Sequence, residues 1–308
     1  MIAVANAIVV VDAGLSAIIS PMTNKSYGSQ SMVAPLQRVL VRRPDTAVSK
    51  ADPQRWHYSA PIHLANAQVE HDAFVALLTE AGCEVAYHDV PLPDHADAQF
   101  THDPSLVCDQ GAIILKMGKS LRQGEEAAQA AMFAKLGVPI HYRLHGEAQG
   151  EGGDMLWLDE RTLLIGLGFR TNMAAVEQLR EALPGVEVIA FDMPIDQGRE
   201  ACLHIMSFIS LLDHDLAIVH LPLMPVRLYQ LLQVRGVQMV EVPPHEYVTM
   251  ATNVLATAPR QCVMLQGNPI TKSRLEAVGC TVRTYKGDDI SLKAEGGATC
   301  LTRPMLRA

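Results

Sequence analysis

Hydrophobic residues fall into short runs along this chain, and the runs follow one recurring order. In residues 154–190, two apolar runs flank a polar turn, apolar residues at helical spacing cover 173–183, and a third apolar run ends the stretch. Runs and turns of this kind predict strand, strand, helix and strand. The same order recurs in the stretches that begin at residues 103, 204 and 253.

A fifth unit is split between the two ends of the chain. The run at 300–302 supplies its first strand, and residues 39–41, 64–82 and 85–87 supply its second strand, helix and last strand. A repeat of about 50 residues indicates an array or a propeller. A unit shared by both termini closes a ring and removes exposed sheet edges. We therefore expect an α/β fold, a five-bladed pseudo-symmetric ββαβ propeller whose last blade is closed by both termini.

One polar residue precedes the first strand of each predicted unit, at spacings of 51, 50, 49 and 47 positions. The set consists of Asp103, Asp154, His204, Asn253 and Cys300. Polar residues precede many strands for structural reasons alone, but the regular spacing and the reactive residue types favour a shared functional site. We expect Asp154 and Asn253 to bind loop backbone rather than to take part in catalysis.

The composition is that of a globular protein, with 49% hydrophobic and 19% charged residues among 308. A net charge of −8 gives no general attraction to nucleic acid or to an anionic membrane. The apolar stretch 1–19 has no Lys or Arg before Lys25, and Asp12 interrupts it. We therefore expect neither a secretory signal nor a membrane anchor at this end.

The cysteines and histidines show no metal or disulfide framework. Six cysteines are scattered without a CxxC pair, and the twelve histidines form no HExxH motif. This pattern favours reduced thiols and a cytoplasmic protein, and we expect no metal and no cofactor. Cys202 and His204 alternate on one predicted strand and could supply part of a metal site, but two ligands seldom suffice.

Four motifs together resemble those of the guanidino-group-modifying enzymes. They are Phe-Thr-His-Asp-Pro at 100–104, Glu-Gly-Gly-Asp at 151–154, Leu-His at 203–204 and Gly-Ala-Thr-Cys at 297–300. The resemblance covers about residues 36–306 and implies the five-bladed pentein propeller, most like that of the dimethylarginine dimethylaminohydrolases.

Two positions depart from the patterns of these enzymes. Arginine deiminases and amidinotransferases usually carry His-x-Asp where this chain has His204-Ile205-Met206. Position 102 is His where dimethylaminohydrolases often have Glu and deiminases have Arg. The preference among guanidino compounds is therefore left open.

Three residues suit chemistry at a guanidinium carbon. Attack on this delocalised centre needs a thiolate, and Cys300 is the candidate nucleophile that would form a covalent intermediate. His204 can protonate the departing amine and then accept a proton from water. Glu151 resembles the family residue that fixes the tautomer of this histidine, and its alternative is a solvated acid in a loop.

Four charged residues are candidates for substrate binding. Asp103 would accept N–H groups of the planar cation. Asp97 matches a second substrate-binding acid of the dimethylaminohydrolases, although it could equally cap a loop. Arg122 and Arg170 match family positions that hold the substrate's α-carboxylate, and the alternative for each is an ion pair with a neighbouring acid.

The predicted organisation is an N-terminal extension over residues 1–35 and a single catalytic domain over 36–308. The turn-rich stretch 20–35 resembles the lid that closes over substrate in this family.

The resemblance implies a hydrolase that cleaves a C–N bond of a methylated arginine or related arginine derivative, giving citrulline and an amine. Arginine deiminase and amidinotransferase chemistry are the near alternatives, and a non-catalytic binding protein on the same propeller is a remote one. The expected partner is a small guanidino substrate, without nucleic acid or membrane, and a homo-oligomer is left open.

Overall fold

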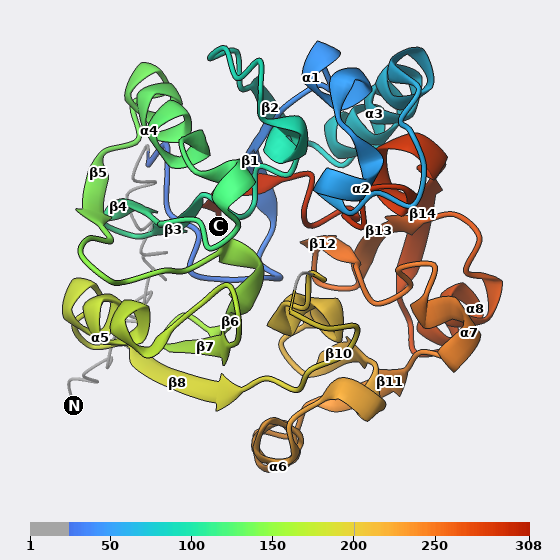
Figure 1. The fold of residues 1–308 in the computed structure, drawn as a ribbon. Helices are drawn as coiled ribbons and strands as arrows, with labels where there is room; N and C mark the ends of the chain where they lie inside the picture. The colour runs from blue at the N-terminus through green and yellow to red at the C-terminus, as the bar shows by residue number, and fades with distance from the viewer. Residues whose placement is uncertain (1–24, 200) are drawn as a thin grey trace, which may run out of the picture.

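Five small sheets surround a common centre, as the repeat predicts. The computed structural model describes residues 25–199 and 201–308, and the strands within them form five three-stranded sheets. Figure 1 shows these sheets in a ring, with the longer helices on the outside. The predicted five-bladed propeller is therefore confirmed.

The second blade along the chain shows the pattern of all five. Its elements are β6 (Met155–Asp159), β7 (Thr162–Leu167), α5 (Met173–Ala182) and β8 (Glu187–Asp192). β6 pairs antiparallel with β7, and β8 returns parallel to β7 after the helix. Asn172 starts α5, because its side chain accepts the backbone N–H of Ala175 at 3.1 Å. The helix buries Val176 and Leu179 on its inner face.

Three other blades repeat this order. The first consists of β3 (Ser105–Cys108), β4 (Gly111–Ile114), α4 (Glu125–Lys135) and β5 (Ile140–Arg143). The third consists of β9 (Ile209–Asp213), β10 (Leu216–Val219), α6 (Val226–Val234) and β11 (Gln238–Glu241). The fourth consists of β12 (Leu255–Ala258), β13 (Gln261–Leu265), α8 (Pro269–Ala277) and β14 (Thr281–Tyr285).

The fifth blade joins segments from opposite ends of the sequence. Its elements are β15 (Arg303–Arg307), β1 (Leu36–Val41), α3 (Leu64–Glu80) and β2 (Glu84–Tyr87). β15 pairs antiparallel with β1, and β1 pairs parallel with β2. The predicted closure by both termini is confirmed.

Two predicted strands begin later than expected. Residues 300–302 form a turn before β15, because the N–H of Thr302 donates to the carbonyl of Thr299 at 3.0 Å. Residues 205–207 form the 3-10 helix η4 (Ile205–Ser207) before β9. In both places short-range hydrogen bonds satisfy the backbone locally, so the chain becomes extended only afterwards.

Short elements that the pattern did not predict complete the loops. They are α1 (Thr46–Lys50), α2 (Pro53–Trp56), α7 (Pro244–Tyr247), the 3-10 turns η1 (Ala96–Gln99), η2 (Ser120–Arg122), η3 (Gly152–Asp154) and η5 (Leu221–Leu223), and the π-helical turn η6 (Asp288–Leu292). Each has only three to five residues, which is too short to show a helical period of apolar positions.

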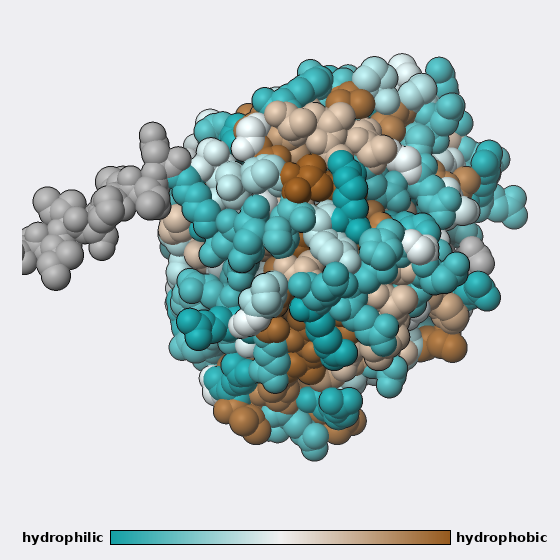
Figure 2. Space-filling view, turned by 90° about the vertical axis from the view of Figure 1, so that its left-hand side faces the viewer, coloured by the Kyte–Doolittle hydropathy of each residue, from teal (hydrophilic) through white to brown (hydrophobic). Residues whose placement is uncertain are grey.

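Adjacent blades share hydrophobic cores, which fixes how the blades sit around the centre. Trp157 of β6 is 1% exposed and belongs to one cluster with Leu106 of β3 and Leu179 of α5. On the outer face shown in Figure 2, hydrophilic residues cover most of the surface, and hydrophobic ones gather in smaller areas between them.

The described part of the N-terminal stretch, residues 25–35, contacts the last blade and the turns of other blades. Gly28 donates its N–H to Met305 and accepts that of Arg307, both at 2.8 Å, and Lys25 pairs with Asp109 at 3.0 Å. Residues 25–35 are not among the residues that line the cavity described below, and the predicted lid over residues 20–35 stays a prediction. Two predictions concern residues outside the described part: the remainder of the lid at residues 20–24, and the absence of a signal or anchor at residues 1–19. Within residues 25–199 and 201–308, no helix has the length and apolar character needed to cross a membrane.

Candidate active site

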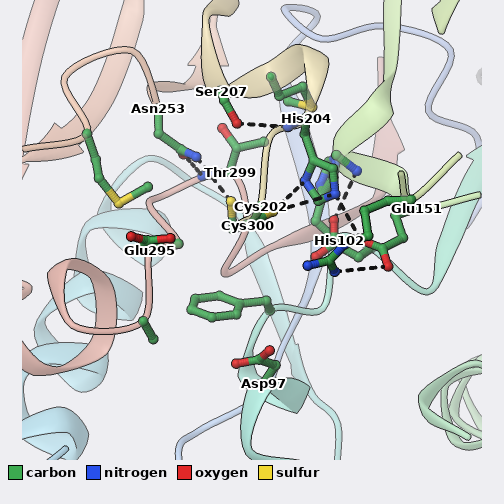
Figure 3. Close-up of a pocket in the computed structure, with 18 of the residues that line it drawn as sticks. Asp97, His102, Glu151, Cys202, His204, Ser207, Asn253, Glu295, Thr299 and Cys300 are labelled. Carbon is green, nitrogen blue, oxygen red and sulfur yellow. Dashed lines mark hydrogen bonds and ion pairs between the residues drawn. The ribbon is translucent and has the colours of Figure 1, made fainter. Parts of the chain in front are cut away.

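A cavity of about 300 Å³ opens where the first strands of the blades begin. All seven residues predicted for catalysis or substrate binding line it: Cys300, His204, Glu151, Asp103, Asp97, Arg122 and Arg170. Figure 3 shows several of the lining side chains around one space, with Asn253 beside Cys300 and Glu151 beside His204. Residues up to about 200 positions apart in the sequence therefore meet in one site.

The thiol of Cys300 lies in the turn that precedes β15. Asn253 Nδ2 donates to Sγ at 3.0 Å, while its Oδ1 accepts the N–H of Thr299 at 2.9 Å. Asn253 thus binds loop backbone, as expected, and also contacts the thiol, which was not expected. Burial raises the pKa of the Cys300 thiol to about 11, and the charge of Asp103 adds to the rise. At neutral pH the thiol of the free protein is therefore protonated.

His204 is held against a buried carboxylate. Its Nε2 lies 2.9 Å from Oε2 of Glu151, which is fully buried, and its backbone N–H donates to Ser207 Oγ at 3.0 Å. Burial opposes a charge on His204, but Cys202, Asp154 and Glu151 outweigh it and raise the pKa of the imidazole. Burial likewise opposes ionisation of Glu151, and the hydrogen bond and charge of His204 overcome it and lower the pKa of this carboxyl. These interactions favour an imidazolium beside a carboxylate.

The glycines of the 151–154 motif permit this close packing. A Cβ on Gly153 would lie 2.2 Å from Nδ1 of His204, and one on Gly152 would lie 2.2 Å from the carbonyl oxygen of His102. Any side chain at these positions would push the loop away from the histidines. The motif therefore brings bare backbone against the catalytic candidates.

Asp103 is fixed by two neighbours. Its Oδ1 accepts the N–H of Gly153 at 2.9 Å, and its Oδ2 accepts Nη1 of Arg122 at 2.5 Å. Burial opposes the charge, but Arg122 and His204 hold the pKa of Asp103 below its usual range. Arg122 also donates to Glu125 at 2.8 Å, and burial raises the pKa of Glu125 to about 7. Arg122 is thus the centre of a buried chain of ion pairs at the wall of the cavity.

The other two predicted binding residues also have protein partners. Asp97 accepts the hydroxyl of Tyr58 at 2.8 Å and the ammonium of Lys119 at 2.6 Å. Arg170 Nη1 lies 3.5 Å from Oε1 of Glu151. For Arg170, the alternative ion pair with a neighbouring acid and the predicted place at the cavity hold together. Asp97 also lines the cavity, and among the described residues its carboxylate binds side chains rather than the loop backbone that a capping residue would bind.

Lys119 is the main site residue that the sequence analysis missed. Its backbone N–H donates to Glu151 at 2.9 Å, and its ammonium donates to the carbonyl of Trp56 at 3.1 Å while lying over the Trp56 ring. It therefore connects the acid beside His204 to Asp97 on the outer wall. Its only signal in the sequence is its position shortly before Arg122, in the loop after β4.

Cys202 and His204 are the two residues that could supply part of a metal site by their spacing in the sequence. Cys202 Sγ lies 3.6 Å from Nδ1 of His204, so the two side chains do come together. Among the described residues, no group of three or more His, Cys, Asp or Glu side chains is arranged to hold a metal ion. The short contact instead places a second, exposed thiol at the edge of the cavity.

Similarity to known proteins covers nearly the whole chain. A family model described as N,N dimethylarginine dimethylhydrolase, eukaryotic, matches residues 38–307. A dimethylarginine dimethylaminohydrolase of Streptomyces coelicolor is 30% identical over 201 residues, which are 62% of this chain and 71% of that protein. An uncharacterized protein of Bacillus subtilis is 27% identical over 88% of this chain and 92% of its own length. An arginine deiminase of Listeria welshimeri is 24% identical over 70% of this chain and 62% of its own length.

Solved structures share the fold. The dimethylarginine dimethylaminohydrolase of Pseudomonas aeruginosa, as a cysteine-to-serine variant complexed with citrulline, has a TM-score of 0.74 at 20% identity, over 89% of this chain and 100% of that one. An amidinotransferase of saxitoxin biosynthesis from Microseira wollei has a TM-score of 0.77 at 17% identity, over 92% of this chain and 98% of that one. Because the family model spans most of the chain and the propeller is the same, the protein belongs to the dimethylarginine dimethylaminohydrolase family of the pentein superfamily.

Proposed function

We propose that this protein hydrolyses a C–N bond in the guanidinium group of a methylated arginine or a related arginine derivative, releasing an amine and citrulline. The observation that carries the proposal is one cavity lined by the Cys300 thiol, the His204–Glu151 pair and the buried carboxylate of Asp103. A nucleophile, a proton carrier and an anion for a flat cation are the groups that this reaction requires. Membership of the dimethylarginine dimethylaminohydrolase family supports the same reaction.

In the proposed first step, the Cys300 thiol releases its proton to water when the substrate binds, and the thiolate attacks the guanidinium carbon. Burial disfavours the thiolate in the free protein, whereas the Asn253 amide and the charge of His204 favour it. A bound guanidinium adds a positive charge beside the sulfur and stabilises the thiolate further. The S–C bond forms, the C–N bond breaks, and the leaving nitrogen takes a proton from the His204 imidazolium.

In the second step, water replaces the amine at the same carbon. Neutral His204 accepts a proton from the attacking water, the C–S bond breaks, and the electron pair returns to Cys300. The hydrogen bond from His204 Nε2 to Glu151 fixes the ring through both steps. The balance is one water consumed and one amine released for each citrulline formed.

The charged residues of the wall suit the two ends of such a substrate. Asp103 faces the guanidinium in this proposal, and Arg170 and Asp97 take the carboxylate and amino groups at the amino-acid end. Arg122 also lines the cavity, but its bonds to Asp103 and Glu125 make fixing Asp103 its main contribution.

A specific observation favours a methylated substrate over arginine itself. Met206 is 4% exposed and lines the cavity at the position where deiminases usually carry an acid. An apolar thioether beside the reacting group favours an N-alkyl substituent, because a buried unpaired N–H would lose its hydrogen bonds to water. Arginine deiminase and amidinotransferase activities are the competing proposals, given the relatives with those names.

The test is to offer the purified protein L-arginine, Nω-methylarginines and agmatine, and to identify the amine and the ureido product by mass spectrometry. We expect methylamine or dimethylamine with citrulline, whereas ammonia from arginine alone would point to a deiminase. Adding an amine acceptor and finding the amidino group on it would point to a transferase. Cys300→Ser should lower turnover at least about 10⁴-fold. Undiminished turnover in that variant would contradict the nucleophile assignment.

A further inference from the structure

His102 lies against the nucleophile loop, although the proposed reaction steps do not use it. It is 3% exposed, lines the cavity, and donates its backbone N–H to the carbonyl of Cys300 at 3.2 Å. The residue is in the loop directly before β3, next to Asp103. The backbone of His102 is therefore tied to the loop that carries Cys300, and the residue forms part of the cavity wall.

One hydrogen bond determines which nitrogen of this ring carries the proton. Nδ1 lies 2.9 Å from the carbonyl oxygen of Thr302, and a carbonyl can only accept, so Nδ1 is the donor. Burial lowers the pKa of His102 to about 3, and the charge of Arg303 acts in the same direction. The ring is thus neutral at physiological pH, with an unprotonated Nε2.

Nε2 is an acceptor without a protein partner among the described residues. No hydrogen bond joins it to residues 25–199 or 201–308, yet it is not sealed from solvent as both ring nitrogens of His71 are. By contrast, both oxygens of Asp103 already accept protein donors, and so do both oxygens of Glu151. His102 Nε2 is therefore a free lone pair on a residue that lines the cavity, in a loop whose backbone binds that of Cys300.

We propose that His102 is a specificity-determining residue: Nδ1–H donates to Thr302, and Nε2 accepts one N–H of the substrate guanidinium. This inference rests on the proposed function, because it requires a guanidino compound in the cavity. A neutral acceptor restricts the orientation of the guanidinium without adding negative charge to the cavity. The nitrogen that faces His102 must carry a hydrogen, so a fully dialkylated nitrogen is directed away from it.

Two substitutions separate the two ring nitrogens. In His102→Asn, the side-chain amide replaces Nδ1 and keeps a donor for Thr302, but the acceptor at the cavity is lost. In His102→Gln, the longer amide reaches the place of Nε2 and restores an acceptor, while the Thr302 bond is lost. Both variants are made in the native protein and in the Cys300→Ser background, with His214→Asn in the exposed β9–β10 turn as a matched control.

The measurements are KM and kcat for Nω,Nω-dimethylarginine, and its calorimetric Kd in the Cys300→Ser background. We expect His102→Asn to raise Kd and KM about tenfold or more, and His102→Gln to raise them less than about threefold. The opposite order, with Asn equal to the parent and Gln impaired, would show that His102 only supports the Thr302 turn. That result overturns the inference and leaves the proposed function intact.

A second measurement covers the case in which either variant fails to fold. The ¹⁵N signal of Nε2 in Cys300→Ser protein should shift on addition of Nω,Nω-dimethylarginine, because the lone pair accepts a hydrogen bond. An unchanged signal at saturating ligand would refute the contact. If the native protein turns over no guanidino compound and the Cys300→Ser protein binds none, the proposed function fails, and this inference fails with it.

Discussion

Burial decides the protonation state of the candidate nucleophile. Cys300 is partly buried in the cavity wall, and its desolvation together with the charge of Asp103 disfavours the thiolate and raises the pKa of the thiol to about 11. We expect a cation bound in the cavity to reverse this balance. In the proposed reaction, Cys300 is thus a thiol in the free protein and a reactive thiolate in the complex.

The pH dependence of alkylation tests this behaviour. Because the pKa of Cys300 is raised, its rate of modification by iodoacetamide should rise roughly tenfold per pH unit across pH 7–10, without a plateau. Peptide mapping of each sample separates Cys300 from the exposed Cys202, and Cys300→Ser gives the background. A plateau below pH 7 in the free protein would contradict the raised pKa.

Asn253 offers a second test at the residue scale. Asn253→Asp keeps the acceptor for the Thr299 N–H but replaces the donor to Cys300 Sγ with a negative oxygen. We expect kcat/KM to fall by about 10- to 100-fold in this variant, which corresponds to the loss of one hydrogen bond to a charged group. Asn253→Ala loses both bonds and should fall at least as far. Full activity of Asn253→Asp would show that the thiol contact has no part in turnover.

At the scale of elements, the turns before the first strands carry the site. Each turn is stabilised by its own short-range bonds, and glycines let neighbouring turns touch. A Cβ on Gly296 would lie 2.1 Å from the ring of Phe100, just as one on Gly153 would meet His204. The distances between catalytic groups therefore depend on backbone that has no side chains at the points of contact.

Gly153→Ala tests this dependence. The new methyl group would displace the His204 ring from Glu151, and a misplacement of about 1 Å can lower the rate about 10²-fold. We expect a kcat loss of that order. The control is Gly168→Ala, where a Cβ would meet nothing closer than 3.8 Å, and it should keep its activity. Equal activities in the two variants would show that the loop relaxes without harm.

At the scale of the molecule, hydrogen bonds between the inner turns join the five blades in a ring. Asp103 binds Gly153, Asp154 binds Ile205, Thr252 binds Ser207, Asn253 binds Thr299, and His102 binds Cys300. Each bond connects one blade to the next, and the last connects the fifth blade to the first. The same residues thus close the propeller and arrange the candidate catalytic groups.

Substitution of Asp154 tests how much this ring of hydrogen bonds contributes to stability, because Asp154 does not line the cavity. Asp154 accepts the Ile205 N–H at 3.1 Å and the Thr171 hydroxyl at 2.7 Å. Asp154→Ala leaves both donors buried and unpaired, and should lower the free energy of unfolding by about 2–4 kcal/mol. Asp154→Asn keeps an acceptor for Ile205 and should lose much less. Denaturant unfolding of both variants is the measurement, and equal losses would contradict the hydrogen-bond explanation.

Much of the fold and of the site could be predicted from the sequence. The repeat and the polar residues at its period are local properties of the chain, because the alternation of apolar residues and the turn residues between them are set within a few positions. The regular spacing of these polar residues and the family motifs together predicted that four residues meet in one site: Cys300, His204, Glu151 and Asp103. The late start of β15 could not be predicted, because it depends on turn bonds that an apolar run does not reveal.

The amino-acid pattern alone specifies the order of strands and helices, the closure of the ring and the residue types that surround its centre. Three other properties arise only in the folded protein: the protonation of the Cys300 thiol, the ion pairs of Arg122 and the tautomer of His102. These properties depend on burial and on charges that come from other blades. Electrostatic interactions act through space, so groups far apart in the sequence acquire them only after the blades have closed around the cavity.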